Sequence, residues 1–208
     1  MNILIASSIS QDSIEQLRQK HEVVCAFNAP EDKLKSLIRD REALIFRSGV
    51  NITADVMACA PHLGLLIRAG SGTENVDLNY VRKKGLTLYR IPEPGAKAVA
   101  ELSFGLMLAL ARNIIQADGL LRKGRWAKNE LAGYLLTGKI LGIIGAGNIG
   151  SRVGRLGAAW GMTVVGCVKH PSPERSKQLE KIGIRLEEFD EVISSSDFIS
   201  IHVPLDDS

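Results

Sequence analysis

Cysteine is scarce in this chain. The 208 residues contain three cysteines, Cys25, Cys59 and Cys167, which lie far apart in the sequence. An odd number of widely spaced cysteines provides neither a disulfide framework nor the paired spacing of a zinc site. We therefore expect three core residues in a protein of the reducing cytoplasm, and no metal site.

An excess of one charge is also absent. The 26 Lys and Arg nearly balance the 23 Asp and Glu, so the formal net charge is +3. This value is too small to indicate a nucleic-acid partner or a membrane surface. Apolar residues make up 45% and charged residues 24% of the chain, as in a globular protein with one good core or two small ones.

Long apolar runs and repeats are missing as well. No run reaches the length that a transmembrane helix needs. The N-terminus, MNILIASS, lacks a basic segment, and its apolar run is too short for a signal peptide, so it is typical of a first strand. We also find no repeat of solenoid period and no low-complexity tract. These absences favour a globular protein without a membrane partner.

Strand-like and helix-like segments alternate over the first half of the chain. Apolar runs predict strands at residues 3–6, 23–27, 43–46, 63–68 and 86–89. Amphipathic stretches predict helices at residues 10–20, 31–40, 53–60 and 77–84. This alternation predicts a flavodoxin-like α/β domain, a parallel and doubly wound sheet with helices on both faces.

Two glycine-rich turns follow neighbouring strands of this domain. The turn RSG begins at Arg47 after the third strand, and the turn AGSG begins at Ala69 after the fourth. Ligands of such sheets bind beyond the carboxyl ends of the strands, and consecutive backbone N–H groups can hold a carboxylate. Composition alone favours ordinary strand-to-helix turns, and a carboxylate site is the alternative.

Residues 98–118 predict one long helix that is apolar on almost every side. Its apolar side chains are Leu102, Phe104, Leu106, Met107, Leu108, Leu110, Ile114 and Ile115. Such a helix must be covered all round, so we expect it to lie between two domains and against a second subunit. Pro92 and Pro94 mark a boundary between domains at residues 1–97 and 98–208, and we predict a homodimer through residues 99–115.

A basic and aromatic stretch comes next in the chain. Arg122, Lys123, Arg125 and Lys128 surround Trp126. Such a mixture can serve nucleic-acid binding. Four charges around one tryptophan are more typical of a solvated arm or a subunit contact, so we expect no nucleic acid.

The stretch KILGIIGAGNIG, which begins at Lys139, contains the strongest motif. An apolar run predicts a buried strand, and G-x-G-x-x-G follows at once, before an amphipathic segment at residues 151–160. Gly145 permits a tight turn, Gly147 admits a pyrophosphate, and Gly150 allows close helix packing. A second strand at residues 163–168 completes Rossmann spacing. We predict a dinucleotide site at the helix N-terminus, and a plain strand–helix turn is the alternative.

The end of that second strand lacks the acid that NAD-binding units place on the adenosine ribose. The sequence reads Val168-Lys169-His170, and a cation at this position can accommodate a 2′-phosphate instead. We therefore expect NADP or NAD as the cofactor, with NADP favoured. A further strand at residues 197–203 carries His202, which is either structural or in contact with the cofactor.

Six motifs in a fixed order resemble one family. They are RSG from Arg47, RAGSGTENVD from Arg68, AVAELSFGLMLALAR from Ala98, KGRWAK from Lys123, GKILGIIGAGNIG from Gly138 and DFISIHVPL from Asp197. Together they look like the D-isomer-specific 2-hydroxyacid dehydrogenase family, which includes D-3-phosphoglycerate dehydrogenase and glyoxylate/hydroxypyruvate reductase. The resemblance implies an NAD(P)-dependent oxidoreductase that transfers a hydride between a nicotinamide and a 2-hydroxy or 2-oxo acid.

The resemblance also implies roles for particular residues. It favours Ser48, Ser71 and Gly72 as ligands of the substrate carboxylate, and a homodimer role for the long helix. It implies that a further set contacts the cofactor, namely Gly147, Asn148, Ile149, His202, Val203 and Pro204. The glycine motif adds Gly145 and Gly150, and the end of the second strand adds Lys169 and His170.

Three departures from the family pattern affect these expectations. Gly95 stands where the family often has an Asn, six residues before Glu101, and Val168 replaces the ribose acid. The family's carbonyl-binding Arg, and its proton-relay His with a supporting Glu, come after the strand that resembles DFISIHVPL. We therefore expect no catalytic residue among these 208, no turnover by them alone, and a Rossmann domain that is incomplete at its C-terminus.

A second hypothesis is a non-enzymatic, dinucleotide-binding dimer that acts as a sensor. The C-terminal-binding-protein corepressors resemble the same family and dimerise around a bound cofactor. The missing catalytic segment fits that interpretation. The lack of a recognisable partner-binding extension argues against it.

Overall fold

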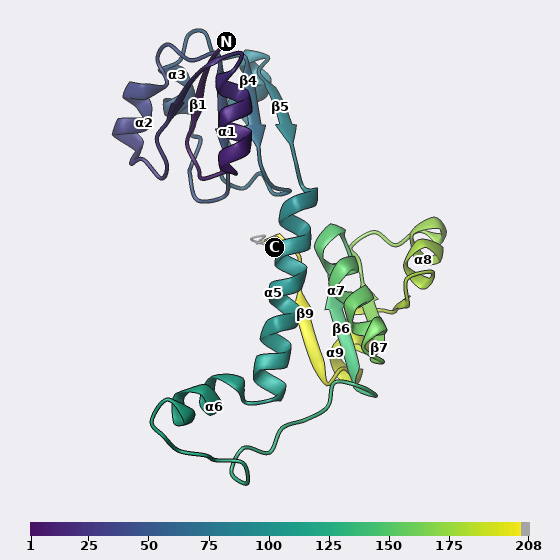
Figure 1. Cartoon of the computed structure of the whole chain (residues 1–208). Coiled ribbons are helices and arrows are strands. Elements are labelled where there is room, and N and C mark those ends of the chain that lie inside the picture. The colour runs from purple at the N-terminus through teal and green to yellow at the C-terminus, as the bar shows by residue number, and fades with distance from the viewer. Residues whose placement is uncertain (205–208) are drawn as a thin grey trace. The chain divides into compact units, whose positions relative to one another are not determined.

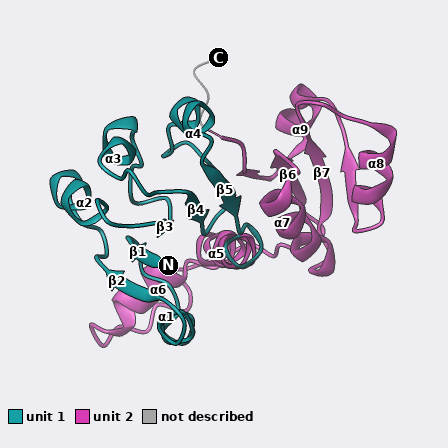
Figure 2. Ribbon diagram, turned by 90° about the horizontal axis from the view of Figure 1, so that it is seen from above, with its two compact units in different colours: residues 1–95 teal, residues 96–208 magenta. Residues whose placement is uncertain are grey.

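The computed structural model describes residues 1–204. It divides the chain into two compact units, Met1–Gly95 and Ala96–Ser208, which Figure 2 shows in two colours. The division falls after residue 95, whereas the prolines led us to expect it after residue 97. Each unit is built on a parallel sheet of its own, so each is described separately below.

Unit 1 has a five-stranded parallel sheet with the strand order β2-β1-β3-β4-β5. This is the flavodoxin order, and it confirms the predicted α/β class. The strands are β1 (Asn2–Ile5), β2 (Glu22–Cys25), β3 (Ala43–Phe46), β4 (Leu65–Arg68) and β5 (Thr87–Arg90). The helices are α1 (Gln11–Arg18), α2 (Glu31–Leu37), α3 (Ala54–Ala58) and α4 (Leu78–Lys84).

The central strands of unit 1 are buried on both faces. The register pairs Leu4 with Leu44 and Leu44 with Leu66, and these three side chains are fully buried in one apolar cluster. Ile5 and Ile45 alternate with them and belong to a second cluster. A sheet with apolar side chains on both faces needs helices on both, and the crossover connections supply them.

Local signals fix where the helices of unit 1 begin and end. Ser10, Thr53 and Asp77 each accept a hydrogen bond from the backbone N–H three residues later. Such a cap is worth roughly 0.5–2 kcal/mol. Gly85 ends α4 in the left-handed conformation, with φ of 66°, which glycine adopts without steric cost.

Unit 2 has a four-stranded parallel sheet with the strand order β8-β7-β6-β9. This is the 3-2-1-4 part of a Rossmann sheet. The strands are β6 (Ile140–Ile144), β7 (Thr163–Cys167), β8 (Ile184–Leu186) and β9 (Phe198–Ile201). The helices are α5 (Glu93–Ala111), α6 (Ile114–Leu121), α7 (Asn148–Ala159), α8 (Pro173–Glu180) and α9 (Phe189–Ser195), of which α5 begins within the last residues of unit 1.

The structure corrects two sequence expectations in unit 2. The long helix predicted at residues 98–118 is interrupted, because Asn113 has a left-handed backbone, with φ of 54°, that no α-helix contains. Figure 1 shows α6 turning away from α5 and leading into the loop before β6. Strand β8 was not predicted, because its three residues are too few to form a periodic pattern.

By length and composition only, helix α5 could cross a membrane. This differs from our expectation that no apolar run is long enough for a transmembrane helix. The core helix of a soluble protein passes the same test. Ala100, Phe104 and Ala111 bury one side of α5 in the apolar core of unit 2. An opposite stripe, which we call the α5 stripe, is exposed and consists of Val99, Leu102, Leu106 and Leu110.

Candidate functional site

The glycine-rich turn follows β6, at the point where the strand order of unit 2 reverses. The backbone N–H groups of Gly145 and Ala146 both donate to the Cys167 carbonyl at the end of β7, at 3.1 Å. On the other side of β6, the His202 N–H donates to the Ile144 carbonyl at 2.7 Å. The turn therefore lies between the ends of β7 and β9, where open α/β sheets bind their ligands.

Two of the three motif glycines are required by the packing of the chain itself. A Cβ on Gly145, which has a φ of 87°, would lie 2.6 Å from the His202 carbonyl oxygen. A Cβ on Gly150 would lie 2.3 Å from the Gly145 carbonyl oxygen. A Cβ on Gly147 would meet no described atom closer than 4.0 Å, which is ordinary contact. Packing within the described residues therefore does not require a glycine at this position.

Helix α7 begins directly after Gly147 and supplies hydrogen-bond donors to the same place. The first N–H groups of a helix, here those of Asn148, Ile149 and Gly150, have no carbonyl partner within the helix. The first turn of α7 contains no acidic side chain, and Gly147 makes no side-chain cap. The positive end of this 12-residue helix therefore fits a pyrophosphate.

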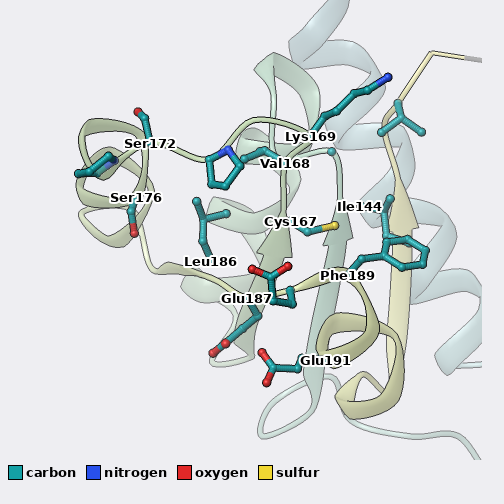
Figure 3. Close-up of a pocket in the computed structure, with 15 residues that line it drawn as sticks. Ile144, Cys167, Val168, Lys169, Ser172, Ser176, Leu186, Glu187, Phe189 and Glu191 are labelled. Carbon is teal, nitrogen blue, oxygen red and sulfur yellow. The ribbon is translucent and has the colours of Figure 1, made fainter.

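A cavity of about 740 Å³ lies along the carboxyl ends of β6 and β7. Strand ends and the loop after β8 give it an apolar wall of Ile144, Cys167, Val168 and Leu186. Figure 3 shows Lys169 at one end of the cavity and Glu187 and Glu191 at the other. A mostly apolar cavity with a few charged groups is typical of a cofactor site, and this one has room for an adenosine moiety.

The loop after β7 carries the predicted cations and one arginine that our sequence analysis missed. Lys169 lines the cavity, and His170 beside it is exposed. Ser172 caps α8 by accepting from the Arg175 N–H at 3.2 Å. The Arg175 guanidinium donates to the Ala146 carbonyl at 2.5 Å and so ties α8 to the glycine-rich turn. No motif points to this contact, because its partners are 29 positions apart.

The residues after β9 border the same turn. A Cβ on Gly145 would meet both the His202 carbonyl and the Val203 side chain, which also lines the cavity. The His202 imidazole is partly buried, and its Nε2 lies 2.8 Å from the Ser200 hydroxyl. Burial lowers the pKa of His202, so the ring stays neutral at pH values where a solvated histidine takes up a proton. Pro204 follows and is exposed.

A second polar centre lies in unit 1, at the ends of β3 and β4. Arg68 is 4% exposed, and its Nε donates to the Asn75 side-chain oxygen at 3.2 Å. The Asn75 amide in turn donates to the carbonyls of Arg47 and Val50, at 3.0 and 2.5 Å. This buried network joins the turn after β3 to the turn after β4. Our sequence analysis did not identify it.

The predicted carboxylate ligands lie on the two turns that this network joins. Ser48 and Ser71 are exposed, and Gly72 is partly buried. A Cβ on Gly72 would lie 2.0 Å from a carboxylate oxygen of Glu74. The Ser71 carbonyl accepts a hydrogen bond from Arg90, the last residue of β5, at 3.3 Å. The site is therefore lined by backbone groups, by arginines and by the Glu74 carboxylate, which is paired with Arg68 at 3.6 Å. Backbone N–H groups and arginines suit an anion.

Within residues 1–204 no group of three or more His, Cys, Asp or Glu side chains is arranged to hold a metal ion. The cysteines Cys25, Cys59 and Cys167 are all free and partly buried.

Comparisons with known proteins identify the family. Residues 104–208 match the model of the D-isomer specific 2-hydroxyacid dehydrogenase, NAD binding domain. The chain is 36% identical over 206 residues to D-3-phosphoglycerate dehydrogenase of Methanocaldococcus jannaschii. This match covers 99% of this chain and 39% of that protein. It is also 36% identical over 201 residues to hydroxypyruvate reductase of Thermotoga maritima. That match covers 96% of this chain and 64% of that protein.

A solved structure agrees with these relatives. D-lactate dehydrogenase from Aquifex aeolicus, complexed with NAD and lactic acid, has a TM-score of 0.79 and 26% identity, and the match covers 99% of this chain and 61% of that one. The chain spans 39% and 64% of the lengths of the two curated relatives. It belongs to the D-isomer-specific 2-hydroxyacid dehydrogenase family.

Proposed function

We propose that unit 2 binds a nicotinamide dinucleotide and that unit 1 binds the carboxylate of a small 2-hydroxy or 2-oxo acid. The protein would interconvert 2-hydroxy acids and 2-oxo acids by hydride transfer to and from the nicotinamide. The main support comes from Gly147. Packing within the chain does not require a glycine there, because a Cβ would meet no described atom closer than 4.0 Å, whereas the close approach of a phosphate would require one. The named dehydrogenase and reductase relatives support the reaction class. Because the chain spans less than two thirds of their lengths, the activity of the whole protein is part of this proposal.

The residues of unit 2 would bind and orient the cofactor. When bound, the nicotinamide supplies or accepts the hydride that passes to or from C2 of the acid. The N–H groups of Asn148, Ile149 and Gly150 would hold the pyrophosphate, whereas that of Gly147 already donates to the Gly145 carbonyl at 2.7 Å. Lys169 and His170 would face the adenosine ribose, and residues 202–204 would border the turn. This preorganisation is the main contribution of a protein to hydride transfer.

The residues of unit 1 would hold the substrate carboxylate. Ser48, Ser71 and Gly72 lie on two turns that the Arg68–Asn75 network keeps in a fixed relation. Backbone N–H groups in such turns are suited to a carboxylate, and a buried network keeps them from rearranging. The turns would therefore fix the orientation of the acid.

Four finer features complete the proposal. Val168 in place of the ribose acid, followed by the cation Lys169, favours NADP over NAD. The exposed α5 stripe favours a homodimer. The three free cysteines fit a cytoplasmic location. Since the family's proton-relay groups are not among these 208 residues, the 208-residue polypeptide alone would bind ligands without turnover.

Titration of the purified chain with NADH and NADPH, followed by nicotinamide fluorescence, tests the cofactor half. We expect saturable binding of NADH or NADPH, and we expect the corresponding oxidised cofactor to displace it. Failure of both to bind at millimolar concentration would contradict the proposal. NMR titration with D-lactate tests the other half, through the backbone amides of Ser48, Ser71 and Gly72.

A further inference from the structure

Arg175 holds one peptide group of the glycine-rich turn from outside the turn. Its Nη2 donates to the Ala146 carbonyl at 2.5 Å, and its Nη1 donates to the Gln178 side-chain oxygen on the same helix at 3.4 Å. The Ala146 N–H donates to the Cys167 carbonyl at 3.1 Å. The backbone of Ala146 is therefore bonded on both sides, to β7 through its N–H and to α8 through its carbonyl.

The bond from Arg175 sets the direction of the peptide group that leads into α7. The carbonyl of Ala146 and the N–H of Gly147 belong to one planar trans peptide, so they point in opposite directions. That N–H donates to the Gly145 carbonyl at 2.7 Å. Gly147 has no Cβ to restrict rotation of this peptide group, and Asn148 directly after it begins α7. Rotation of the peptide group would therefore displace the first N–H groups of the helix.

Helix α8 gives Arg175 a fixed base. Ser172 caps the helix at its start, and Leu179, which is 1% exposed, packs into the apolar core of unit 2 near its end. Arg175 lies between these two anchors and is partly buried. A hydrogen bond from a guanidinium is charge-assisted and therefore stronger than one between neutral groups. One side chain thus connects the helix after β7 to the turn after β6.

Arg175 itself does not line the cavity that has room for an adenosine moiety. Ser172 and Ser176, on either side of it in the chain, do line the cavity, and Figure 3 shows both at this helix. An effect of Arg175 on a bound dinucleotide would therefore pass through the turn, and not through a contact with the adenosine.

We propose that Arg175 is a positioning residue, which keeps the turn after β6 in the conformation that receives the pyrophosphate of the cofactor. This inference rests on the proposed function, because it assumes that a dinucleotide binds at the turn. Without the bond to Ala146, the peptide group rotates for part of the time. The affinity for the cofactor then falls in proportion to the fraction of chains whose turn is competent to bind.

Titrations of the purified 208-residue chain with NADH, NADPH and ADP test the inference. Arg175→Met keeps a long side chain without its donors. It should weaken binding of all three ligands about tenfold, as the loss of a hydrogen bond from a charged group does. Arg175→Lys can still donate to one carbonyl, so it should restore binding to within about threefold of the wild type. Lys177→Met, at an exposed position of the same helix, is the matched control for the lost charge.

Hydrogen exchange of backbone amides shows where the substitution acts. In Arg175→Met the buried Ala146 N–H should exchange faster than in the wild type, because the turn opens more often. The Leu179 N–H on α8 should keep its rate. Equal acceleration at both amides would mean that Arg175 only stabilises α8, and the inference would be wrong.

The remaining outcomes separate this inference from the proposed function. Undiminished binding of all three ligands by Arg175→Met would overturn the inference and leave the proposed function intact. A loss confined to NADPH would make Arg175 a ligand of the 2′-phosphate. A loss that Arg175→Lys does not restore would indicate a bidentate contact with the pyrophosphate. Either result would overturn the positioning role. If the wild-type chain binds none of the three at millimolar concentration, the cofactor half of the proposed function is wrong, and the inference falls with it.

Discussion

At the scale of single residues, Gly147 and Gly150 belong to one motif but are glycine for different reasons. Gly150 cannot carry a side chain, because a Cβ would lie 2.3 Å from the Gly145 carbonyl oxygen. Gly147 has room for one within the chain. The same substitution at the two positions should therefore separate folding from binding.

Gly147→Ala should leave thermal stability nearly unchanged and weaken cofactor binding by at least about tenfold, ~1.4 kcal/mol. Gly150→Ala should destabilise unit 2 by roughly 1–3 kcal/mol, as overpacking usually does. Thermal unfolding and cofactor titration of both variants measure the two effects. A Gly147→Ala chain that binds cofactor normally would show that no phosphate approaches this position.

A second prediction concerns the preference between NADPH and NADH. The Val168 side chain cannot accept a hydrogen bond from a ribose hydroxyl, whereas the Lys169 ammonium beside it can pair with a 2′-phosphate. The chain should bind NADPH at least as tightly as NADH, and Lys169→Ala should weaken NADPH binding while leaving NADH binding nearly unchanged. Lys177→Ala, an exposed lysine on α8 that does not line the cavity, is the control. Tenfold tighter binding of NADH by the wild-type chain, ~1.4 kcal/mol, would reject the preference.

His202 should couple stability to pH. Its pKa is lowered by burial from the ordinary value of 6.5, so the unfolded chain takes up a proton before the folded chain does. This contribution to the free energy of unfolding is therefore fully present above about pH 6.5 and is lost as the pH falls toward the folded-state pKa. NMR titration of the ring should give a midpoint below 6.5. His202→Gln should flatten the stability profile in that window, and a midpoint above 6.5 would contradict the assignment.

At the scale of elements, α5 has two faces with different roles. Ala100, Phe104 and Ala111 are buried in the core of unit 2, whereas Leu106 and Leu110 are 59% and 72% exposed. The exposed residues of the α5 stripe, Val99, Leu102, Leu106 and Leu110, recur at three- and four-residue spacing. Ile114, Ile115 and Trp126 add further exposed apolar surface after α5. An apolar surface of this kind marks an interaction site.

The element-scale prediction is a homodimer that depends on this stripe. Leu106→Asp should give folded monomers, because it places a charge in the proposed interface. Met107→Asp should instead destabilise unit 2, since Met107 packs against the core cluster. Gln116→Asp, on an exposed polar position of α6, controls for the added charge. Sedimentation of each chain at micromolar concentration measures the assembly state. A monomeric wild-type chain would refute the dimer.

At the scale of the whole molecule, binding and turnover should be separable. Loss of general acid–base catalysis costs ~10²–10⁴-fold, and loss of an electrostatic contact to the reacting oxygen costs about 10²–10³-fold. No arginine follows Arg185 in the 208 residues, and the His202 ring lies beside Ser200. The 208-residue polypeptide should bind cofactor without reducing substrate.

Steady-state assays with glyoxylate, hydroxypyruvate and 3-phosphohydroxypyruvate test this prediction, in parallel with the cofactor titration. Turnover at rates ordinary for enzymes, about 1–10³ s⁻¹, would mean that groups within these residues perform the proton transfer. Cofactor binding without turnover is the expected result.

Local patterns in the sequence determined the class of fold and the place of the glycine-rich turn after β6. Alternating apolar and amphipathic runs predict the α/β class because burial in a strand or a helix imposes a short, readable period. The glycine motif is readable for the same reason, since its strand, turn and helix are consecutive. The helix cap Asp77 and the end at Gly85 are equally local, because each acts within one turn of its own helix.

Tertiary structure decided the contacts between distant residues. Asn75 reaches the carbonyl of Arg47 across 28 positions, and Arg175 reaches that of Ala146 across 29. No periodic pattern encodes such pairs, because they depend on which strand ends meet at one edge of a sheet. Arg90 is an ordinary edge-strand cation in the sequence. It reaches the Ser71 carbonyl only because the sheet order brings β5 beside β4 and the turn that follows it.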